Sequence, residues 1–279
     1  AGFAFTTSQD IGALSGDRDE GKNNSELSSS AGNYTELSEA YINYAYDGFN
    51  FRAGRQMLDT PLADSDDIRM IPNTFEAYMA TYELNNFTFT AGNVQRWQGV
   101  DAGLDDGWVD TGDNGTWLGG VTYSDAIEFN AWYYDISEAS TNNTATGNVA
   151  NQSFYMDASI NLLLNETYEL HLNGEYLNQS EQDQSAIEAN IYGLMVEFIV
   201  DKSLTIAAAY NHSDEKSAKG SFAGFGGGTL FTGMDNMVLD AITFDRGASA
   251  VGGGLTYEYD DFTFLYAYGE FKGDENSIG

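Results

Sequence analysis

The chain has 279 residues, with 43 acidic and 11 basic side chains, a formal net charge of -32 and no cysteine. This charge argues against nucleic acid and anionic membrane surfaces as electrostatic partners, because both attract basic patches, and it favours cations or basic solutes. The absence of cysteine excludes a disulfide scaffold and a thiolate metal site.

The first clear elements are two alternating runs, Glu39–Tyr46 and Phe49–Met57, joined by the tight turn Asp47-Gly48. An acidic loop, Leu58–Asn73, leads from them to a third alternating run, Thr74–Leu84. A period of two residues is typical of a strand that is apolar on one face and polar on the other. These runs are therefore predicted to be strands.

The remaining chain repeats this unit of strand, tight turn, strand and long loop. A short strand, Ala1–Thr7, and a polar loop precede it. The later strands are predicted at Asn86–Arg96, Gly115–Tyr123, Ala126–Ile136, Gln152–Leu164, Thr167–Leu177, Ala186–Val200, Ser203–His212, Ala248–Tyr259 and Asp261–Phe271. The longest connection, Ser213–Gly247, is predicted to be an external loop.

Short and long connections alternate along the chain, from turns of two or three residues to loops of roughly 8–35 residues, as in outer-membrane barrels. The architecture of a soluble β-sandwich does not predict that every long loop lies at one end. No apolar run approaches the ~20 residues that a membrane helix requires. The sequence thus predicts an all-β fold, a transmembrane antiparallel β-barrel, as one domain over residues 1–279.

We count about thirteen strands, whereas bacterial single-chain barrels normally have an even number. We therefore expect strands to be missing at both ends. The location implied by this architecture is the bacterial outer membrane.

Alternation also assigns the inner face of each strand. In Phe154–Leu162, for example, Phe154 and Met156 share the apolar face, and Tyr155 and Asp157 share the polar one. Period two places one face toward lipid and the other toward the lumen. The lumen residues predicted in this way are Glu128, Asp157, Glu169, His171, Glu175, Glu188 and Glu258.

No catalytic group is predicted, so we expect a protein that is not an enzyme. His171 and His212 have no motif around them and are interpreted as lumen or rim residues. The sequence GFGGG at Gly224–Gly228 lacks the Lys-Ser/Thr sequel of a phosphate loop, and we expect it to be flexible.

The segment Phe51–Tyr78 resembles the OprD-type outer membrane porins, particularly their Campylobacter-related branch. The resemblance is carried by Gly54-Arg55-Gln56, Asp59-Thr60-Pro61, Asp64–Asp67 and Pro72-Asn73-Thr74-Phe75. It implies a barrel of about eighteen strands, a homotrimer surrounded by outer-membrane lipid and lipopolysaccharide, and passage of small hydrophilic solutes. It also implies that Leu58–Asn73 folds inward as the pore constriction.

Charges gather at this loop and the strands beside it. The predicted constriction residues are Arg52, Arg55, Asp59, Asp64, Asp66, Asp67, Arg69, Glu76 and Arg96. Basic residues facing carboxylates would create a transverse field that sorts ions by sign; alternatively, the arginines tie the loop to the wall. Alternation places Arg52 in the lumen and Arg55 outside it, unless Gly54 carries a bulge.

A passive barrel of this kind requires no cofactor. The predicted loops are acidic, however, and Ca²⁺ binds carboxylate oxygens. The candidate calcium ligands are Asp64, Asp66, Asp67, Asp110 and Asp113.

The leading hypothesis is a passive porin with an acidic lumen that prefers cations over anions. The alternative is a structural or adhesive surface protein with a plugged barrel. The loop aromatics Phe222, Phe225 and Phe231 keep that alternative open.

Overall fold

The computed structural model describes residues 1–8, 34–65, 72–99, 102, 107–138, 148–214, 220–226 and 247–273. These residues form one antiparallel sheet of 14 strands and a separate two-stranded hairpin. Thirteen strands of the sheet follow one another in chain order, and β8 pairs with β7 beside that path. The predicted all-β fold and the predicted strand count are confirmed.

The thirteen consecutive strands have lengths suited to barrel walls. They are β1 (Gly2–Ser8), β2 (Tyr34–Tyr46), β3 (Phe49–Gln56), β6 (Thr74–Leu84), β7 (Phe87–Gln98), β9 (Thr116–Ser124), β10 (Ile127–Ile136), β11 (Asn151–Leu163), β12 (Tyr168–Glu181), β13 (Ala189–Val200), β14 (Leu204–Ser213), β15 (Ala248–Tyr259) and β16 (Phe262–Lys272). Three very short strands were not predicted: β4 (Asp59–Thr60), β5 (Ala63–Asp64) and β8 (Val109–Asp110).

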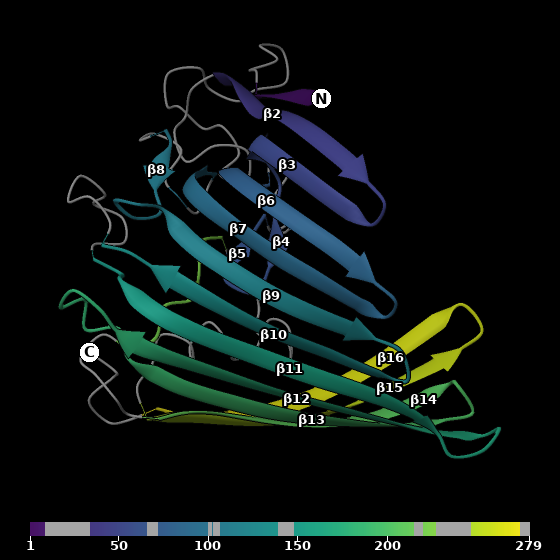
Figure 1. Ribbon diagram of the computed structural model, residues 1–279. Helices are drawn as coiled ribbons and strands as arrows, with labels where there is room; N and C mark the ends of the chain where they lie inside the picture. Colours follow the sequence, from purple (N-terminus) through teal and green to yellow (C-terminus); the bar gives the residue numbers. More distant parts are fainter. Residues whose placement is uncertain are drawn as a thin grey trace, which may run out of the picture.

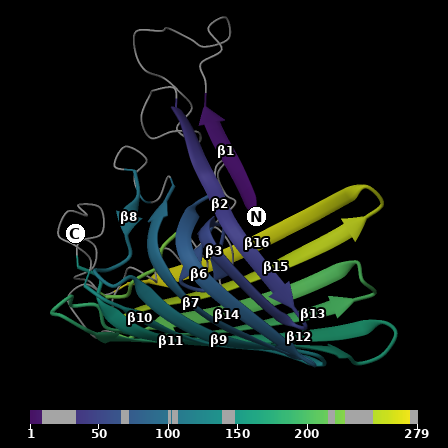
Figure 2. The ribbon, with the colours of Figure 1, turned by 45° about the horizontal axis from the view of Figure 1, so that its top comes forward.

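The sheet curves strongly, so that β15 and β16 lie behind the wall formed by β6 to β13 (Figure 1). The same curvature is visible when the molecule is turned (Figure 2). The tight turns, among them Asp47-Gly48 and Asp201-Lys202, lie together at one end of the wall (Figure 1). Among the described strands, β1 and β16 each pair with one neighbour, so the curved sheet is open there.

Tight turns close the hairpins where the sequence predicts them. Asp47 and Gly48 have φ angles of 45° and 77°, and Asp201 and Lys202 have φ angles of 50° and 57°. Positive φ at both central residues is the geometry of a type I′ turn, whose twist matches that of the flanking strands. These turns hold the paired strands in register.

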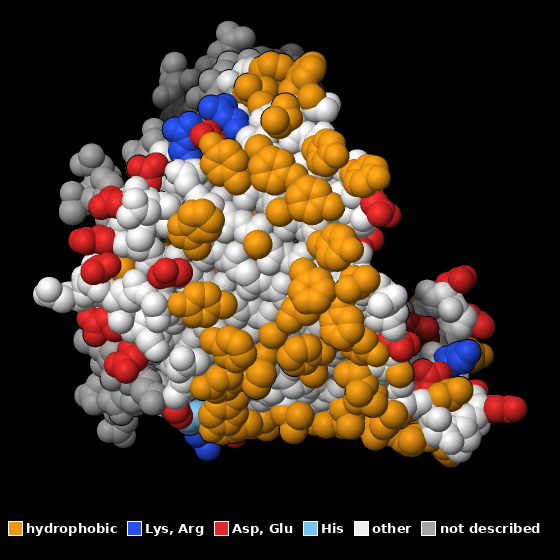
Figure 3. Space-filling view, in the orientation of Figure 1, with side chains coloured by type: hydrophobic (Ala, Val, Ile, Leu, Met, Phe, Trp, Pro, Cys, Tyr) orange, Lys and Arg blue, Asp and Glu red, His pale blue; other side chains and the backbone are white. Residues whose placement is uncertain are grey.

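The wall has two chemically different faces. The convex face carries exposed apolar side chains over a broad band (Figure 3). The members on β11 to β14 include Phe154, Met156, Tyr168, Tyr192, Leu194, Ile206 and Tyr210. Within the described residues, no helix is long and apolar enough to cross a membrane.

Candidate functional site

The loop predicted as a constriction folds into a small hairpin. Strands β4 and β5 pair Asp59 with Asp64 and Thr60 with Ala63. The hairpin is closed at its base by Ser65, whose N–H donates to the Leu58 carbonyl at 2.8 Å and whose hydroxyl accepts from the Leu58 N–H at 2.9 Å. It is therefore a defined element of the structure, and its backbone is largely paired internally.

The hairpin packs on the concave face of the sheet. Leu62 and Ala63 are buried, and the Leu62 N–H donates to the hydroxyl of Tyr134 on β10 at 3.3 Å. Tyr134 itself is fully buried. The surrounding apolar cluster also draws side chains from β6, β7, β12 and β13: Phe75, Trp97, Leu177 and Ile191. Apolar packing thus holds this loop against the inner wall.

A second loop segment, residues 220–226, lies against the same hairpin. The Phe225 N–H donates to the Leu62 carbonyl at 2.9 Å, and the Asp64 N–H donates to the Phe225 carbonyl at 3.0 Å. The Phe225 ring packs edge-on against Trp97, with ring centroids 6.0 Å apart. The two loops, far apart in sequence, therefore form one body on the concave face.

Two glycines make this close approach feasible. A Cβ built on Gly224 would lie 3.0 Å from the Leu62 backbone, and one on Gly226 would clash with the Asp64 carbonyl oxygen. Their φ angles, 106° and 92°, also favour glycine. Of the glycine-rich segment GFGGG, Gly224–Gly226 are packed against backbone partners, whereas Gly227 and Gly228 lie outside the described residues.

Gln179 on β12 anchors the same segment to the wall. Its side-chain amide donates to the Phe222 carbonyl at 3.0 Å and accepts from the Phe222 N–H at 2.7 Å. Gln179 is buried, so both polar groups of the amide are paired away from water. Sequence reasoning missed Gln179, and it named Phe222 and Phe225 only as loop aromatics that would fit a plugged barrel. The only available signal was the mixture of aromatic residues and glycines in a polar loop.

The hairpin presents two carboxylates side by side, since Asp59 and Asp64 are register partners. Both lie where a constriction was predicted. Of the other predicted constriction residues on this loop, Asp66, Asp67 and Arg69 lie outside the described residues.

Acidic side chains line the concave face below the loops. Asp157 on β11 and Glu175 on β12 are directly opposite each other, and both are buried. Asn130 donates to Asp157 at 2.9 Å, and Ser159 donates to Glu128 at 3.4 Å. Register also places Glu258 on this face, since its neighbours Tyr257 and Tyr259 belong to the exposed apolar face.

His171 lies between two carboxylates on the same face. Its Nε2 is 3.7 Å from Glu169 and its Nδ1 is 3.7 Å from Glu197. Glu197 was not predicted, although the alternation of β13 places it inward. Glu188 was predicted instead, but it precedes β13 and is exposed, so strand alternation does not apply to it.

His212 lies on the opposite face. It pairs in register with the exposed Tyr192, whose ring centroid is 5.1 Å away, and its Nε2 is 3.2 Å from Asp214. It is therefore a residue of the outer rim at the loop end of the wall.

Arg52 faces inward, as alternation predicts. It is opposite Met79 and Asn43, its Nε donates to Asn43 at 3.3 Å, and its guanidinium lies 4.5 Å from the Tyr41 ring centroid. Among the described strand residues it is the only arginine or lysine on the concave face.

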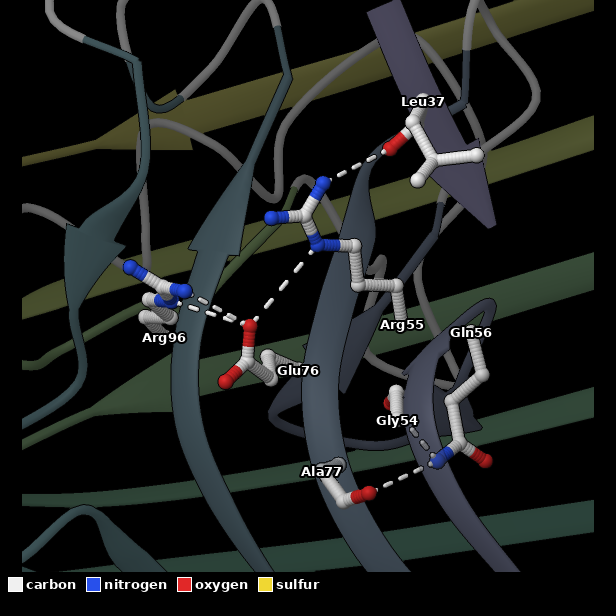
Figure 4. A network of polar contacts seen from close by, with 7 residues as sticks. All are labelled: Leu37, Gly54, Arg55, Gln56, Glu76, Ala77 and Arg96. Carbon is white, nitrogen blue, oxygen red and sulfur yellow. Dashed lines mark hydrogen bonds and ion pairs between the residues drawn. The ribbon is translucent and has the colours of Figure 1, made fainter. Parts of the chain in front are cut away.

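Arg55, Glu76 and Arg96 lie on the convex face, which corrects their assignment to the constriction (Figure 4). Register pairs Arg55 with Glu76, and Glu76 with Arg96. Their neighbours Phe75 and Trp97 point the other way, into the buried cluster. Gly54 does not interrupt the register, so Arg55 keeps the outward direction given by alternation.

A single carboxylate joins these two arginines. Glu76 accepts from Arg96 Nε at 3.1 Å and Nη2 at 2.8 Å, and it lies 3.8 Å from Arg55 Nε. A bulge between Glu76 and Ala77 in the β6–β7 pairing takes up Gln95 and brings Arg96 onto the outer face. Without knowledge of this bulge, the direction of Arg96 is not predictable from the sequence.

The described residues contain no group of three or more metal-binding side chains arranged to hold an ion. Asp64, Asp110 and Asp113 are described, whereas Asp66 and Asp67 are not. Calcium binding at these aspartates stays a prediction.

Comparison with known families gives one match over most of the chain. A family model described as outer membrane porin, OprD family, matches residues 13–219. No curated protein matches the sequence. The Campylobacter-related branch is not distinguished by this match.

Solved structures with the same fold come from Pseudomonas aeruginosa and Acinetobacter baumannii. P. aeruginosa OpdL is 14% identical with a TM-score of 0.67, and the match covers 87% of this chain and 66% of OpdL. P. aeruginosa OccK8 (OprE) is 14% identical with a TM-score of 0.67, covering 86% and 67%. A. baumannii OccAB2 is 14% identical with a TM-score of 0.64, covering 85% and 60%. The chain thus spans about two thirds of the length of these structures, and the likeness shows the fold.

Proposed function

Because the chain belongs to the OprD family of outer membrane porins, whose members are integral outer-membrane β-barrels, we propose that it forms a passive channel for small hydrophilic solutes. The observation that carries the proposal is the two-faced wall. One face is a broad exposed apolar band, and the other bears polar and acidic side chains around an inward hairpin. A lipid-facing wall around a polar lumen is the arrangement of a porin.

We further propose that the channel prefers cations. The concave face of the described strands carries at least nine carboxylates against the single arginine Arg52. They are Glu39, Glu83, Glu128, Asp157, Glu169, Glu175, Glu181, Glu197 and Glu258. Rings of acidic side chains favour cations by raising their local concentration and lowering their electrostatic barrier.

Planar-bilayer recording of the full-length protein across a KCl gradient tests both proposals. We expect stepwise conductance and a reversal potential of the sign given by K⁺ moving faster than Cl⁻. A reversal potential of the opposite sign would contradict the cation preference, and absence of conductance would contradict the channel.

A plugged barrel with a structural or adhesive role is the second candidate. The observation that favours it is the apolar body made by Leu62, Phe222 and Phe225 on the inner wall. A properly folded protein that inserts into bilayers without conductance would favour this candidate.

The homotrimer implied by family resemblance is also part of the proposal. Light scattering of the purified protein, corrected for bound detergent, would measure the number of chains in the particle.

A further inference from the structure

The convex face carries a compact set of charged and aromatic side chains that the channel function does not use. We define it as the outer arginine cluster, made of Arg55, Glu76, Arg96 and Trp108. The two guanidinium carbons lie 4.8 Å and 5.4 Å from the centre of the Trp108 ring. Stacking on one indole holds both cations in a fixed place at the surface.

The cluster lies at the loop end of the wall. Arg55 is the penultimate residue of β3 and Glu76 is near the start of β6, so both are remote from the tight turns. In Figure 3, blue side chains with a red one between them lie at the margin of the orange band. In a membrane-inserted wall, this margin is the level of the lipid headgroups on the side of the long external loops.

The cations exceed the carboxylates that bind them. Glu76 is the carboxylate bonded to the guanidinium groups, and among the described contacts no bond engages Arg55 Nη2 or Arg96 Nη1. Asp110 is opposite Arg96 across β7 and β8, but it is exposed. Among the described contacts, no ion pair within 4.0 Å joins Asp110 to Arg55 or Arg96. The Arg55 and Arg96 side chains retain 28% and 37% of their exposure.

We propose that the outer arginine cluster binds a phosphate group of a lipid headgroup in the outer leaflet, the phosphorylated lipid anchor of lipopolysaccharide. Guanidinium N–H groups match phosphate oxygens in a planar fork, and arginine is weakly hydrated, which suits an interfacial site. An indole at the same level fits the aromatic belts that anchor proteins at membrane interfaces. The apolar band that continues from the cluster would contact the acyl chains of the same lipid.

The total charge of the chain, -32, argues against an anionic surface as partner, but that number averages over the whole molecule. Screening limits the reach of exposed charges to about 10 Å at 0.1 M salt, so a local pair of cations decides local binding. The proposal depends on membrane insertion and not on conductance.

Retention of lipid by variants of the full-length protein tests the proposal. We would purify each protein from outer membranes, exchange it into detergent, and titrate it with bisphosphorylated and dephosphorylated lipid A while counting bound lipids by native mass spectrometry. The double variant Arg55→Gln/Arg96→Gln should bind bisphosphorylated lipid A at least threefold more weakly. Dephosphorylated lipid A should bind all variants equally.

Glu76→Gln separates lipid binding from a purely structural role. Removing this carboxylate frees both guanidinium groups, so phosphorylated lipid should bind more tightly, whereas a cluster that only braces the strands would show no gain. Lys202→Gln, which removes a positive charge in a tight turn at the other end of the wall, is the matched control and should bind like the wild type.

Three results would overturn the proposal. The first is unchanged lipid affinity in the folded double variant, or in Arg55→Gln alone if the double variant does not fold. The second is loss of chain association at unchanged lipid affinity, which would assign the cluster to a contact between copies. The third is that inorganic phosphate competes for the cluster as well as bisphosphorylated lipid A does, which would indicate a general anion site.

Discussion

The backbone N–H of Phe225 donates a 2.9 Å hydrogen bond to the carbonyl of Leu62, and this bond joins the two loops on the concave face. One loop follows β3 and the other follows β14. Segments that are far apart along the chain therefore meet on the concave face. The part of the chain that packs on the inner wall is therefore built from two loops joined by backbone hydrogen bonds.

Replacing Gly226 by Ala should loosen this join. The added Cβ would clash with the Asp64 carbonyl oxygen and would sit on a backbone with φ of 92°. We expect the free energy of unfolding to fall by about 1–3 kcal/mol, with larger and noisier single-channel conductance. Gly107→Ala is the control, because Gly107 also has a positive φ of 72° but a Cβ there meets nothing within 4 Å. Equal conductance changes in both variants would contradict the role of the join.

Tyr134→Phe should weaken the anchor between the hairpin and β10. The hydroxyl accepts from the Leu62 N–H at 3.3 Å, and its removal leaves a buried donor without that partner. The expected cost is about 1–3 kcal/mol of stability, measured as a lower denaturant midpoint in lipid vesicles. Tyr133→Phe is the matched control on the exposed face of the same strand. The anchor would be unimportant if both variants unfolded at the same midpoint.

Neutralising the buried acidic pair should reduce cation preference. Asp157 and Glu175 are opposite each other on the concave face, so Asp157→Asn/Glu175→Gln removes two neighbouring charges. If the pair together lowers the free energy of a passing cation by about 1 kcal/mol, its removal should reduce the cation-to-anion permeability ratio roughly fivefold. Reversal potentials in a KCl gradient measure it. Glu166→Gln, in a tight turn, should leave the ratio unchanged, and an equal effect there would assign selectivity to net charge alone.

Lysine substitutions on neighbouring residues of β13 should separate the two faces. Leu194 is 56% exposed on the convex face, whereas Met195 points inward. Leu194→Lys should cost about 2–4 kcal/mol of folding stability in lipid, as a charge near the bilayer midplane does. Met195→Lys should leave stability nearly unchanged and lower cation preference. Equal destabilisation by both substitutions would contradict the assignment of the faces.

Strand alternation predicts which face of the sheet carries several of these side chains. The inward placement of Arg52, Asp157 and Glu175 follows from period two, because a strand residue cannot change faces without a change of register. The same rule places Arg55 outside, and the register through Gly54 agrees with it. The error for Arg55 lay in grouping it with the constriction by sequence proximity rather than by face.

Other parts of the site depend on contacts that leave no periodic signal. The bulge that turns Arg96 outward is a local change of pairing between β6 and β7. The contact of Gly224 and Gly226 with the hairpin joins two irregular loops whose separation along the chain is large. Neither alternation nor composition specifies which loop meets which.

The amino-acid pattern alone predicted the strands, their tight turns and the two faces of the wall, because each depends on residues adjacent along the chain. Only the folded chain established that residues 220–226 close onto the inward hairpin and that Arg55 and Arg96 share Glu76 on the outer surface. These relationships depend on sheet curvature, register and one bulge, which bring together residues that no local pattern connects.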